Sequence, residues 1–448
     1  MSKKLLFFSF LILILSSCHG VTNVDLRTQT KTPVVLPDTW TPEPTNFTSP
    51  TPSPTPTQPP PFSPSPSSGG HSGLTPTAEP PAAVPPLTSG EEVTIISIRM
   101  FTPNQGWAVG TQGPTIPRIL ITNDGAQSWQ DRTPPIEFSS NPFLMSQTPA
   151  VYFWDQNTAW VLYEQEIIAD EPDQHHIWHT SDGGVNWSAS DPLPYQIELY
   201  SGTPAQFFFI GPQQGWFLSH SIMTHMHDYS SLFRTLDGGQ TWHLVNQPGD
   251  SMIEALANTE IAFSNEKAGW MLKDSLGGFE PFLEVTLNGG IRWQQVDLPA
   301  PDGSWFNLDR RCIGSDPVFF PDGEGRFLLN CAAFDEDLGT YDLETAASYI
   351  YSSDNMGSVW QIKQLPSSVN QLVFHDGQIG HALGSDHYIT RDGGASWNLV
   401  KSVSWTGDFS FISPLEIWAV ARDGDEIALV HSVDGGDTYQ LIQPIILD

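Results

Sequence analysis

The sequence predicts an all-β fold: a seven-bladed β-propeller preceded by a disordered Pro/Thr/Ser-rich stalk. Two repeats that run in phase along the chain predict the ring, and the proline-rich composition upstream predicts the stalk. Each repeat unit carries the signals of about four short antiparallel strands, and its length of roughly 50 residues matches one propeller blade. Closing such units into a ring limits the number of exposed strand edges.

The first repeat is an octet that reads TNDGAQSW over Thr122–Trp129. It returns at 180–187, 235–242 and 390–397, and in degenerate form from Thr286, from Ser352 (one residue longer) and from Ser432. Glycines supply the positive φ of a tight hairpin turn, the carboxylate can accept hydrogen bonds from the turn, and the final aromatic can pack near the neighbouring blade. We therefore expect a structural rather than a catalytic or calcium-binding role for Asp124, Trp129, Asp182, Trp187, Asp237, Trp242, Asn288, Trp293, Asp354, Trp360, Asp392, Trp397, Asp434 and Tyr439.

The second repeat is a pair of aromatic positions six or seven residues apart, ahead of each octet. Turn residues separate the two positions and apolar alternation flanks them, which indicates strand, turn, strand. The pairs are Phe101/Trp107, Phe153/Trp160, Phe209/Trp216, Phe263/Trp270, Phe320/Phe327, Phe374/His381 and Phe411/Trp418.

The N-terminus has the pattern of an export signal. Lys3 and Lys4 precede the apolar run Leu5–Leu15, and small residues lead to Cys18. This order resembles the bacterial lipoprotein lipobox, which implies acylation of Cys18 and anchoring to a membrane of the bacterial cell envelope on its extracytoplasmic side. The alternative is an ordinary secretory signal with an incidental cysteine. We expect a signal peptide over 1–17, a lipidated N-terminus and Pro/Thr/Ser linker over 18–92, and the propeller over 93–448.

The composition excludes several classes of protein. Only 18 Lys and Arg stand against 50 Asp and Glu, a formal net charge of −32, so a nucleic-acid-binding surface is not expected. Three cysteines exclude a disulfide-dense scaffold, and we expect no cofactor. Cys312 and Cys331 lie almost symmetrically about the turn 321–325. We favour a disulfide between them over two buried thiols.

Histidines near the middle of the chain form a weak metal motif. His225 and His227 would share one face of a strand, with Asp228 beside them. Solvated loop histidines are the commoner explanation of such a motif, so no metal site is predicted.

The octets resemble Asp-boxes, also called BNR repeats, which occur in bacterial sialidases, sortilin-type receptors, some glucan hydrolases and the photosystem II assembly and stability factor family. The phased Phe101…Gly106-Trp107-Ala108-Val109-Gly110 is most similar to the last of these. The resemblance covers about 93–448 and implies the propeller. The Tyr/Phe-Arg-Ile-Pro segment of sialidases has no match, because the nearest text is Ile116-Pro117-Arg118-Ile119. The fold leaves function open, since many chemistries occur on such propellers.

We expect a non-enzymatic, membrane-anchored, monomeric scaffold that binds a protein or glycan ligand where loops converge on the ring axis. The alternative is an exported glycoside hydrolase, sialidase-like or glucan-active, or a carbohydrate-binding protein. Two close carboxylates at the axial mouth would favour the hydrolase.

Overall fold

In the computed structural model the chain divides into two units after residue 79, and every described residue belongs to the second. The described residues are 86–113, 116–136, 148–163, 175–193, 205–224, 227–246, 254–255, 260–274, 281–301, 310–335 and 340–447. The predicted signal peptide, Cys18 and the predicted linker up to residue 85 lie outside them. Residues 86–92 of that linker are described, and the Gly90 N–H donates to the Ile446 carbonyl at 2.8 Å. Within these ranges all regular elements are strands, and none is a helix of the length and apolar character that crosses a membrane.

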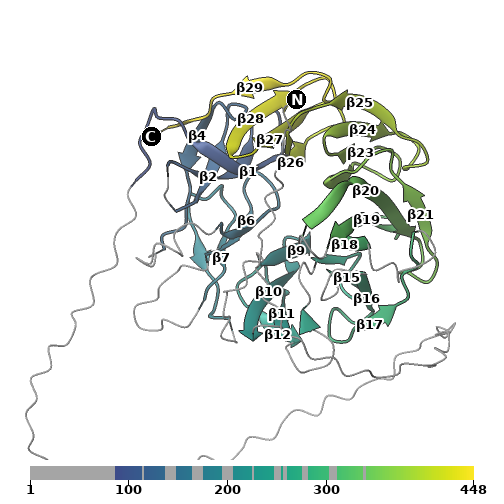
Figure 1. Cartoon of the computed structure of the whole chain (residues 1–448). Coiled ribbons are helices and arrows are strands. Elements are labelled where there is room, and N and C mark those ends of the chain that lie inside the picture. The colour runs from purple at the N-terminus through teal and green to yellow at the C-terminus, as the bar shows by residue number, and fades with distance from the viewer. Residues whose placement is uncertain are drawn as a thin grey trace, which may run out of the picture. The chain divides into compact units, whose positions relative to one another are not determined.

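Seven antiparallel sheets follow one another along the chain and surround a common axis (Figure 1). The predicted seven-bladed propeller is therefore confirmed. Blade 1 contains β1 (Thr94–Met100), β2 (Gly106–Thr111), β3 (Arg118–Thr122) and β4 (Ser128–Asp131). Blade 2 contains β5 (Ala150–Phe153), β6 (Ala159–Leu162), β7 (Trp178–Thr180) and β8 (Ser188–Ala189). Blade 3 contains β9 (Gln206–Gly211), β10 (Gln214–Thr224), β11 (His227–Thr235), β12 (His243–Asn246) and a short β13 (Glu254–Ala255) that pairs with β11. Blades 4 and 5 contain β14 (Glu260–Phe263), β15 (Gly269–Asp274), β16 (Pro281–Thr286) and β17 (Gln294–Val296); β18 (Arg310–Phe319), β19 (Gly325–Asp335), β20 (Thr340–Ser353) and β21 (Gln361–Gln364). Blades 6 and 7 contain β22 (Gln371–Phe374), β23 (Gly380–Leu383), β24 (Asp386–Thr390) and β25 (Asn398–Ser402); β26 (Thr406–Phe411), β27 (Ile417–Asp423), β28 (Glu426–Ser432) and β29 (Gln440–Ile442).

The ring closes where its two ends meet at blade 1. The last strand, β30 (Ile445–Ile446), pairs in parallel with the outer edge of β4. On the inner side, the Met100 backbone N–H donates to Ser410 Oγ at 2.8 Å, which joins blade 1 to blade 7. Chain ends that pair with each other leave fewer strand edges open to other chains.

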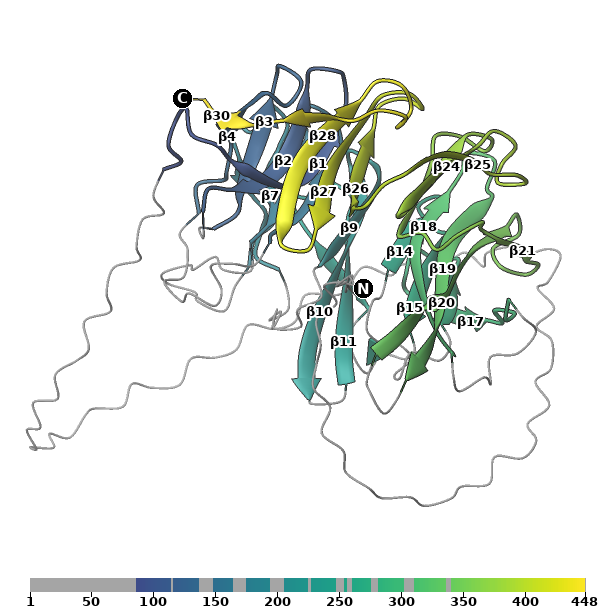
Figure 2. The same cartoon turned by 45° about the horizontal axis from the view of Figure 1, so that its top comes forward.

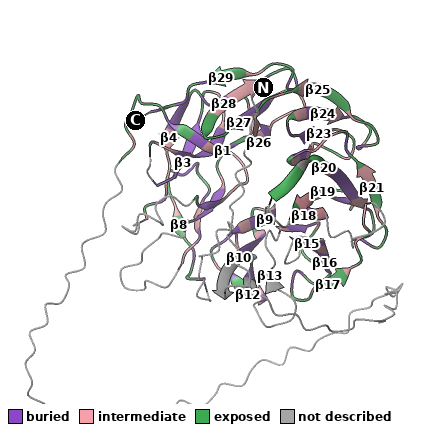
Figure 3. Ribbon diagram, in the orientation of Figure 1, coloured by how far each residue is buried: buried purple, intermediate pink, exposed green. Residues whose placement is uncertain are grey.

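The core lies between blades, not within them. A sheet buries both faces here, since each blade packs against a neighbour on either side. Second strands such as β2 and β6 are accordingly buried along almost their whole length (Figure 3). The aromatic pairs of the second sequence repeat supply much of this packing, as where Trp216 stacks on Phe263 of the next blade with ring centroids 3.7 Å apart.

The two faces of the ring differ in the length of their connections. In a four-stranded meander the first and third turns lie at one end of the blade, and the second turn and the link to the next blade lie at the other. The octets form the third turns, so we call their side the octet face and the opposite side the hairpin face. The long strands of blades 3 and 5, β10–β11 and β19–β20, project on the hairpin face (Figure 2).

Candidate functional site

The octet turns share one hydrogen-bond scheme. In the first, Thr122 Oγ1 donates to Asp124 Oδ1 at 3.0 Å, and the Ser128 N–H donates to the same oxygen at 2.9 Å. The Ala126 N–H donates to Thr122 Oγ1 at 3.0 Å. The bond from the N–H four residues on recurs in the other six turns at 2.8–3.0 Å, with Asp182, Asp237, Asn288, Asn355, Asp392 and Asp434 as acceptors.

These bonds hold the octet carboxylates in their ionised form. The hydrogen bonds from Ser396 lower the pKa of Asp392 to about 2, and those from Thr438 do the same for Asp434. A carboxylate whose oxygens already accept such bonds is poorly suited to transfer protons near neutral pH.

The fifth octet corrects the sequence analysis. Its acceptor is Asn355, not Asp354: Ser353 Oγ donates to Asn355 Oδ1 at 2.9 Å, and the Val359 N–H donates to it at 2.8 Å. The octet thus starts at Ser353 and has the usual length. Met356 takes the left-handed conformation, φ 57°, where all six other octets have glycine, and this departure from the pattern concealed the register.

Tryptophan side chains join several octet turns to neighbouring blades. Trp160 Nε1 donates to the Gly238 carbonyl at 2.8 Å, and Trp216 Nε1 donates to the Gly289 carbonyl at 3.0 Å, in each case in the octet of the following blade. The octet residue Trp187 instead reaches back, donating to the Arg132 carbonyl of the preceding blade at 2.8 Å.

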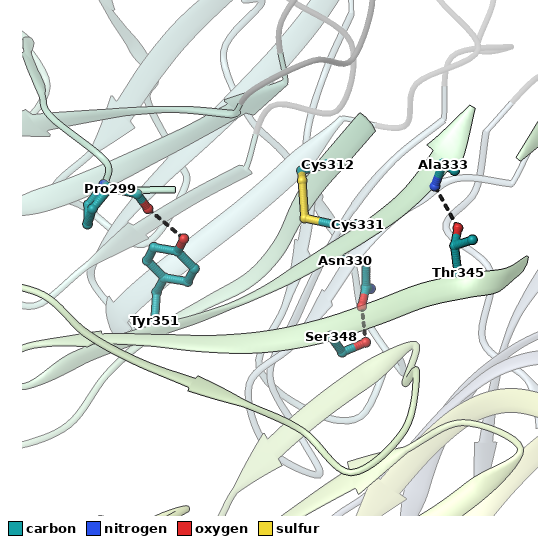
Figure 4. Close-up of a disulfide and its surroundings, with 8 residues drawn as sticks. All are labelled: Pro299, Cys312, Asn330, Cys331, Ala333, Thr345, Ser348 and Tyr351. Carbon is teal, nitrogen blue, oxygen red and sulfur yellow. Dashed lines mark hydrogen bonds between the residues drawn. A yellow bond between two sulfur atoms is a disulfide. The ribbon is translucent and has the colours of Figure 1, made fainter. Parts of the chain in front are cut away.

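Cys312 and Cys331 lie directly opposite one another on β18 and β19 and form a disulfide (Figure 4). Both are buried. Nearby, Tyr351 Oη donates to the Pro299 carbonyl at 2.6 Å (Figure 4). The disulfide lies in the core between blades 4 and 5.

The weak metal motif is only partly visible. His225 lies outside the described residues, and His227 and Asp228 lie on β11 with side chains that are likewise not described. Across the described part of the chain no three His, Cys, Asp or Glu side chains are placed to hold a metal ion.

A row of polar side chains on the innermost strands escaped the sequence analysis. These residues precede the first aromatic of the pair, or the neighbouring Phe319 in blade 5, by three positions, and they are Gln206, Glu260, Asp316, Gln371 and Asp408. Four of them accept a backbone hydrogen bond from the next blade. The donors are Ile261 to Gln206 at 2.7 Å, Asp316 to Glu260 at 2.8 Å, Leu372 to Asp316 at 3.3 Å and Phe409 to Gln371 at 3.2 Å. Aligning the inner strands on their aromatic residues would have shown this row of polar residues, because a buried inner strand is otherwise apolar at such positions.

Asp316 is the unusual member of this axial row. It is a non-glycine residue at φ 55°, it precedes Pro317, and the ladder between β18 and β19 shifts register around it. Burial, to which the negative charge of Asp408 adds, raises the pKa of Asp316 to about 6. Asp408 itself lies 3.5 Å from the guanidinium of Arg422. A carboxyl group with a strained backbone and a raised pKa is typical of functional sites.

No known family model matches the sequence, and no curated protein matches it. Solved structures similar to this chain include "YCF48 bound to D1 peptide", with 18% identity, 80% of this chain and 98% of that chain covered, and a TM-score of 0.46. The polysaccharide lyase Uly1 has 10% identity, 81% and 91% coverage and a TM-score of 0.49. The GH93 α-L-arabinofuranosidase of Fusarium graminearum with arabinobiose has 13% identity, 63% and 91% coverage and a TM-score of 0.40. At these identities neither a family nor an activity is assigned.

Proposed function

We propose that this chain is a lipid-anchored, extracytoplasmic binding propeller, not an enzyme, and that its octets are structural Asp-boxes. One observation carries the proposal. The repeated acidic side chains are committed to the scaffold, because each octet acceptor binds the N–H groups of its own turn. Glu260 and Asp316 likewise bind the N–H groups of neighbouring blades.

The hairpin face, with the axial row beneath it, is the surface we assign to binding. Repeat proteins often place variable insertions on the face that meets the ligand, and here the long strands of blades 3 and 5 project on that face. A net charge of −32 disfavours anionic ligands and favours a cationic or neutral protein or glycan.

The test uses the full-length chain with an oligolysine peptide and, separately, neutral oligosaccharides. We expect binding of the peptide to weaken between about 0.05 and 0.5 M salt, because the screening length falls several-fold. We expect no release of product from sialosides, xyloglucan or aryl glycosides. If no probe binds at any salt concentration, or if any of the substrates is turned over, the proposal is contradicted.

Anchoring is tested separately. Cys18→Ala should move the chain from the detergent phase to the aqueous phase, because acyl chains supply the membrane affinity. Unchanged partitioning would mean that the leader is an ordinary secretory signal.

Asp316 favours a second candidate, a glycoside hydrolase or a carbohydrate-binding protein. A carboxyl with pKa about 6 near a second carboxylate, Asp408, has the electrostatic character of a general acid and its partner. If the chain hydrolyses one of the glycosides above, Asp316→Asn should abolish turnover, whereas Asp237→Asn in an octet should not. Those two results together would favour the hydrolase over the binding propeller.

A further inference from the structure

The contact between blades 6 and 7 differs chemically from the other contacts in the ring. The second aromatic position of the sequence repeat is filled by a fully buried tryptophan in five blades and by phenylalanine in blade 5. These residues are Trp107, Trp160, Trp216, Trp270, Trp418 and Phe327. Blade 6 has His381, also 0% exposed. A group that can gain a charge therefore occupies a place where every other blade has one that cannot.

His381 does not stand alone. Its Nδ1 lies 2.9 Å from Nε2 of His387 on the adjacent strand β24, and His387 is 2% exposed. At this distance the two imidazoles share one proton, since one nitrogen must donate and the other accept. Protonation of one ring at its outer nitrogen leaves a positive charge buried, and protonation of both rings also places hydrogens on both facing nitrogens and breaks the hydrogen bond.

Blade 7 packs directly on this pair. The ring of Phe411 on β26 lies 4.6 Å from that of His381, and the ring of Phe409 lies 6.3 Å from that of His387. The last octet also touches it, because a Cβ added at Gly436 would lie 2.4 Å from the His387 ring. The pair is thus a central part of the contact between the two blades, beside the bond from the Phe409 N–H to Gln371.

The neighbouring polar groups do not offset an added positive charge. The ring of His375 lies 5.2 Å from that of His381, and Arg391 adds a further positive charge. Tyr439 Oη lies 3.4 Å from His387 Nδ1. Lys401, the cross-strand partner of His387 on β25, donates to the Asp437 carbonyl.

The carboxylates nearest in sequence are engaged elsewhere. Asp376 accepts the N–H groups of Gln378 and Ile379 at 2.7 Å. Asp386 accepts from Ser402 Oγ at 2.6 Å and from Tyr388 Oη at 3.2 Å. Asp434 of the last octet, whose charge acts on Tyr439, accepts the N–H and the hydroxyl of Thr438 at 2.9 and 2.6 Å. Within the described residues, the side chains in contact with the pair are thus neutral, and the nearby carboxylates are held by other donors.

We propose that the His381–His387 pair makes the contact between blades 6 and 7 acid-sensitive, so that proton uptake by the pair loosens these blades while the rest of the ring stays closed. Burial lowers the pKa of His387 to about 4, and burial together with the neighbouring positive charges lowers that of His381 to about 3. Because both values lie below the ordinary 6.5, the stabilisation is fully present above pH 6.5 and is lost as the pH falls toward 4 and then 3.

The size of the effect follows from proton linkage. Each proton taken up on opening raises the opening equilibrium constant about tenfold per pH unit, so the pair gives at most about a hundredfold per unit. The octet carboxylates respond at lower pH, because their pKa values lie below 3.8 in the folded chain.

The test compares urea midpoints of the full-length chain between pH 8 and 4.5 for the parent and three variants. His381→Phe copies blade 5, His387→Gln keeps a hydrogen-bonding side chain that does not titrate, and the exposed His243→Gln is the matched control. Below pH 6.5 the urea midpoints of the parent and of the control should fall by the same amount. The midpoints of the other two variants should fall less steeply with pH. If His381→Phe fails to fold, His387→Gln decides.

Hydrogen exchange localises the change. After correction for intrinsic rates, peptides from β23, β24 and β26 should lose protection between pH 7 and 5 in the parent but not in His387→Gln. Profiles of equal slope in the parent and His387→Gln, or loss of protection that begins in other blades, overturn the proposal.

Discussion

Carboxylates in the octets and in the axial row both accept backbone N–H groups, but the pKa is lowered in the octets and raised at Asp316 in the axial row. In the octets, carboxylates at the surface accept N–H and O–H donors from one turn, and the pKa falls to about 2 at Asp392 and Asp434. In the axial row, Asp316 accepts one backbone N–H from the next blade, at 3.3 Å, and its pKa rises to about 6.

The difference shows that the number of donors and the access of water, not the residue type, decide what a carboxylate does. Several short bonds at an exposed turn favour the charged form, and the group becomes part of the scaffold. Inside the ring, the long bond from the Leu372 N–H and the side-chain bond with Ser315 do not repay the lost hydration, and Asp316 exchanges its proton near pH 6.

The largest expected effect comes from removing the tryptophans that pack the octet turns against neighbouring blades. Trp160→Ala removes a fully buried ring and its bond to the Gly238 carbonyl, and should cost about 3–5 kcal/mol. Trp187 is only half-buried, so Trp187→Ala should cost less free energy of unfolding but should still lower the Tm by several degrees. Urea and thermal unfolding measure both; a loss of ligand binding with unchanged stability in Trp187→Ala would contradict the structural role of the octets.

The octet acceptor itself should matter next. Asp237→Ala leaves the Thr241 N–H and the Thr235 hydroxyl without their acceptor, which should cost about 1–3 kcal/mol. Asp237→Asn should restore most of this, because Asn288 and Asn355 serve as acceptors in two natural turns.

The same pair of variants gives a pH signature. Although burial opposes it, the bonds from Thr241 and Thr235 lower the pKa of Asp237, so its contribution is present above pH 3.8 and lost as the pH falls further. The urea midpoints of the parent and Asp237→Asn should therefore converge below pH 4. An equal gap between them at pH 7 and pH 3 would show that charge plays no part.

The axial row should respond with the opposite sign. The folded-state pKa of Asp316 is raised, so its ionisation costs stability as the pH rises from 3.8 to about 6, and that cost persists above. Asp316→Asn keeps an acceptor for the Leu372 N–H and should raise the urea midpoint at pH 7.5 by a modest amount. The gain should vanish below pH 4; a lower midpoint at pH 7.5 would mean that the charged form stabilises the ring.

The fold was predictable because its signals are local and repeated. Octets and aromatic pairs recur often enough that the loss of one, such as Trp to His381, does not hide the period. Register within a degenerate copy was less accessible, since Met356 in a left-handed conformation is not foreseen by a glycine-based pattern.

The candidate site was not predictable, because it depends on contacts between blades. The bond from Leu372 to Asp316 joins residues 56 positions apart, and the raised pKa comes from burial between blades, with a smaller addition from the charge of Asp408 in a third blade. A sequence pattern marks Asp316 as polar on an inner strand but gives no sign of its burial or its strain. Similarly, His381 and His387 are close in sequence, but what makes them notable is the packing of Phe409 and Phe411 against them.

The smallest expected effect tests the register of the fifth octet. Asp354 is exposed and makes none of the bonds of the turn scheme, so Asp354→Ala should change the free energy of unfolding by less than about 0.5 kcal/mol. Asn355→Ala removes the acceptor for the Ser353 hydroxyl and the Val359 N–H, and should cost about 1 kcal/mol or more. The two variants differ by one position in the same turn, so each is the other's control for local disruption. Equal midpoints in urea would mean that this turn does not depend on its acceptor, whereas a larger loss for Asp354→Ala would restore the longer octet.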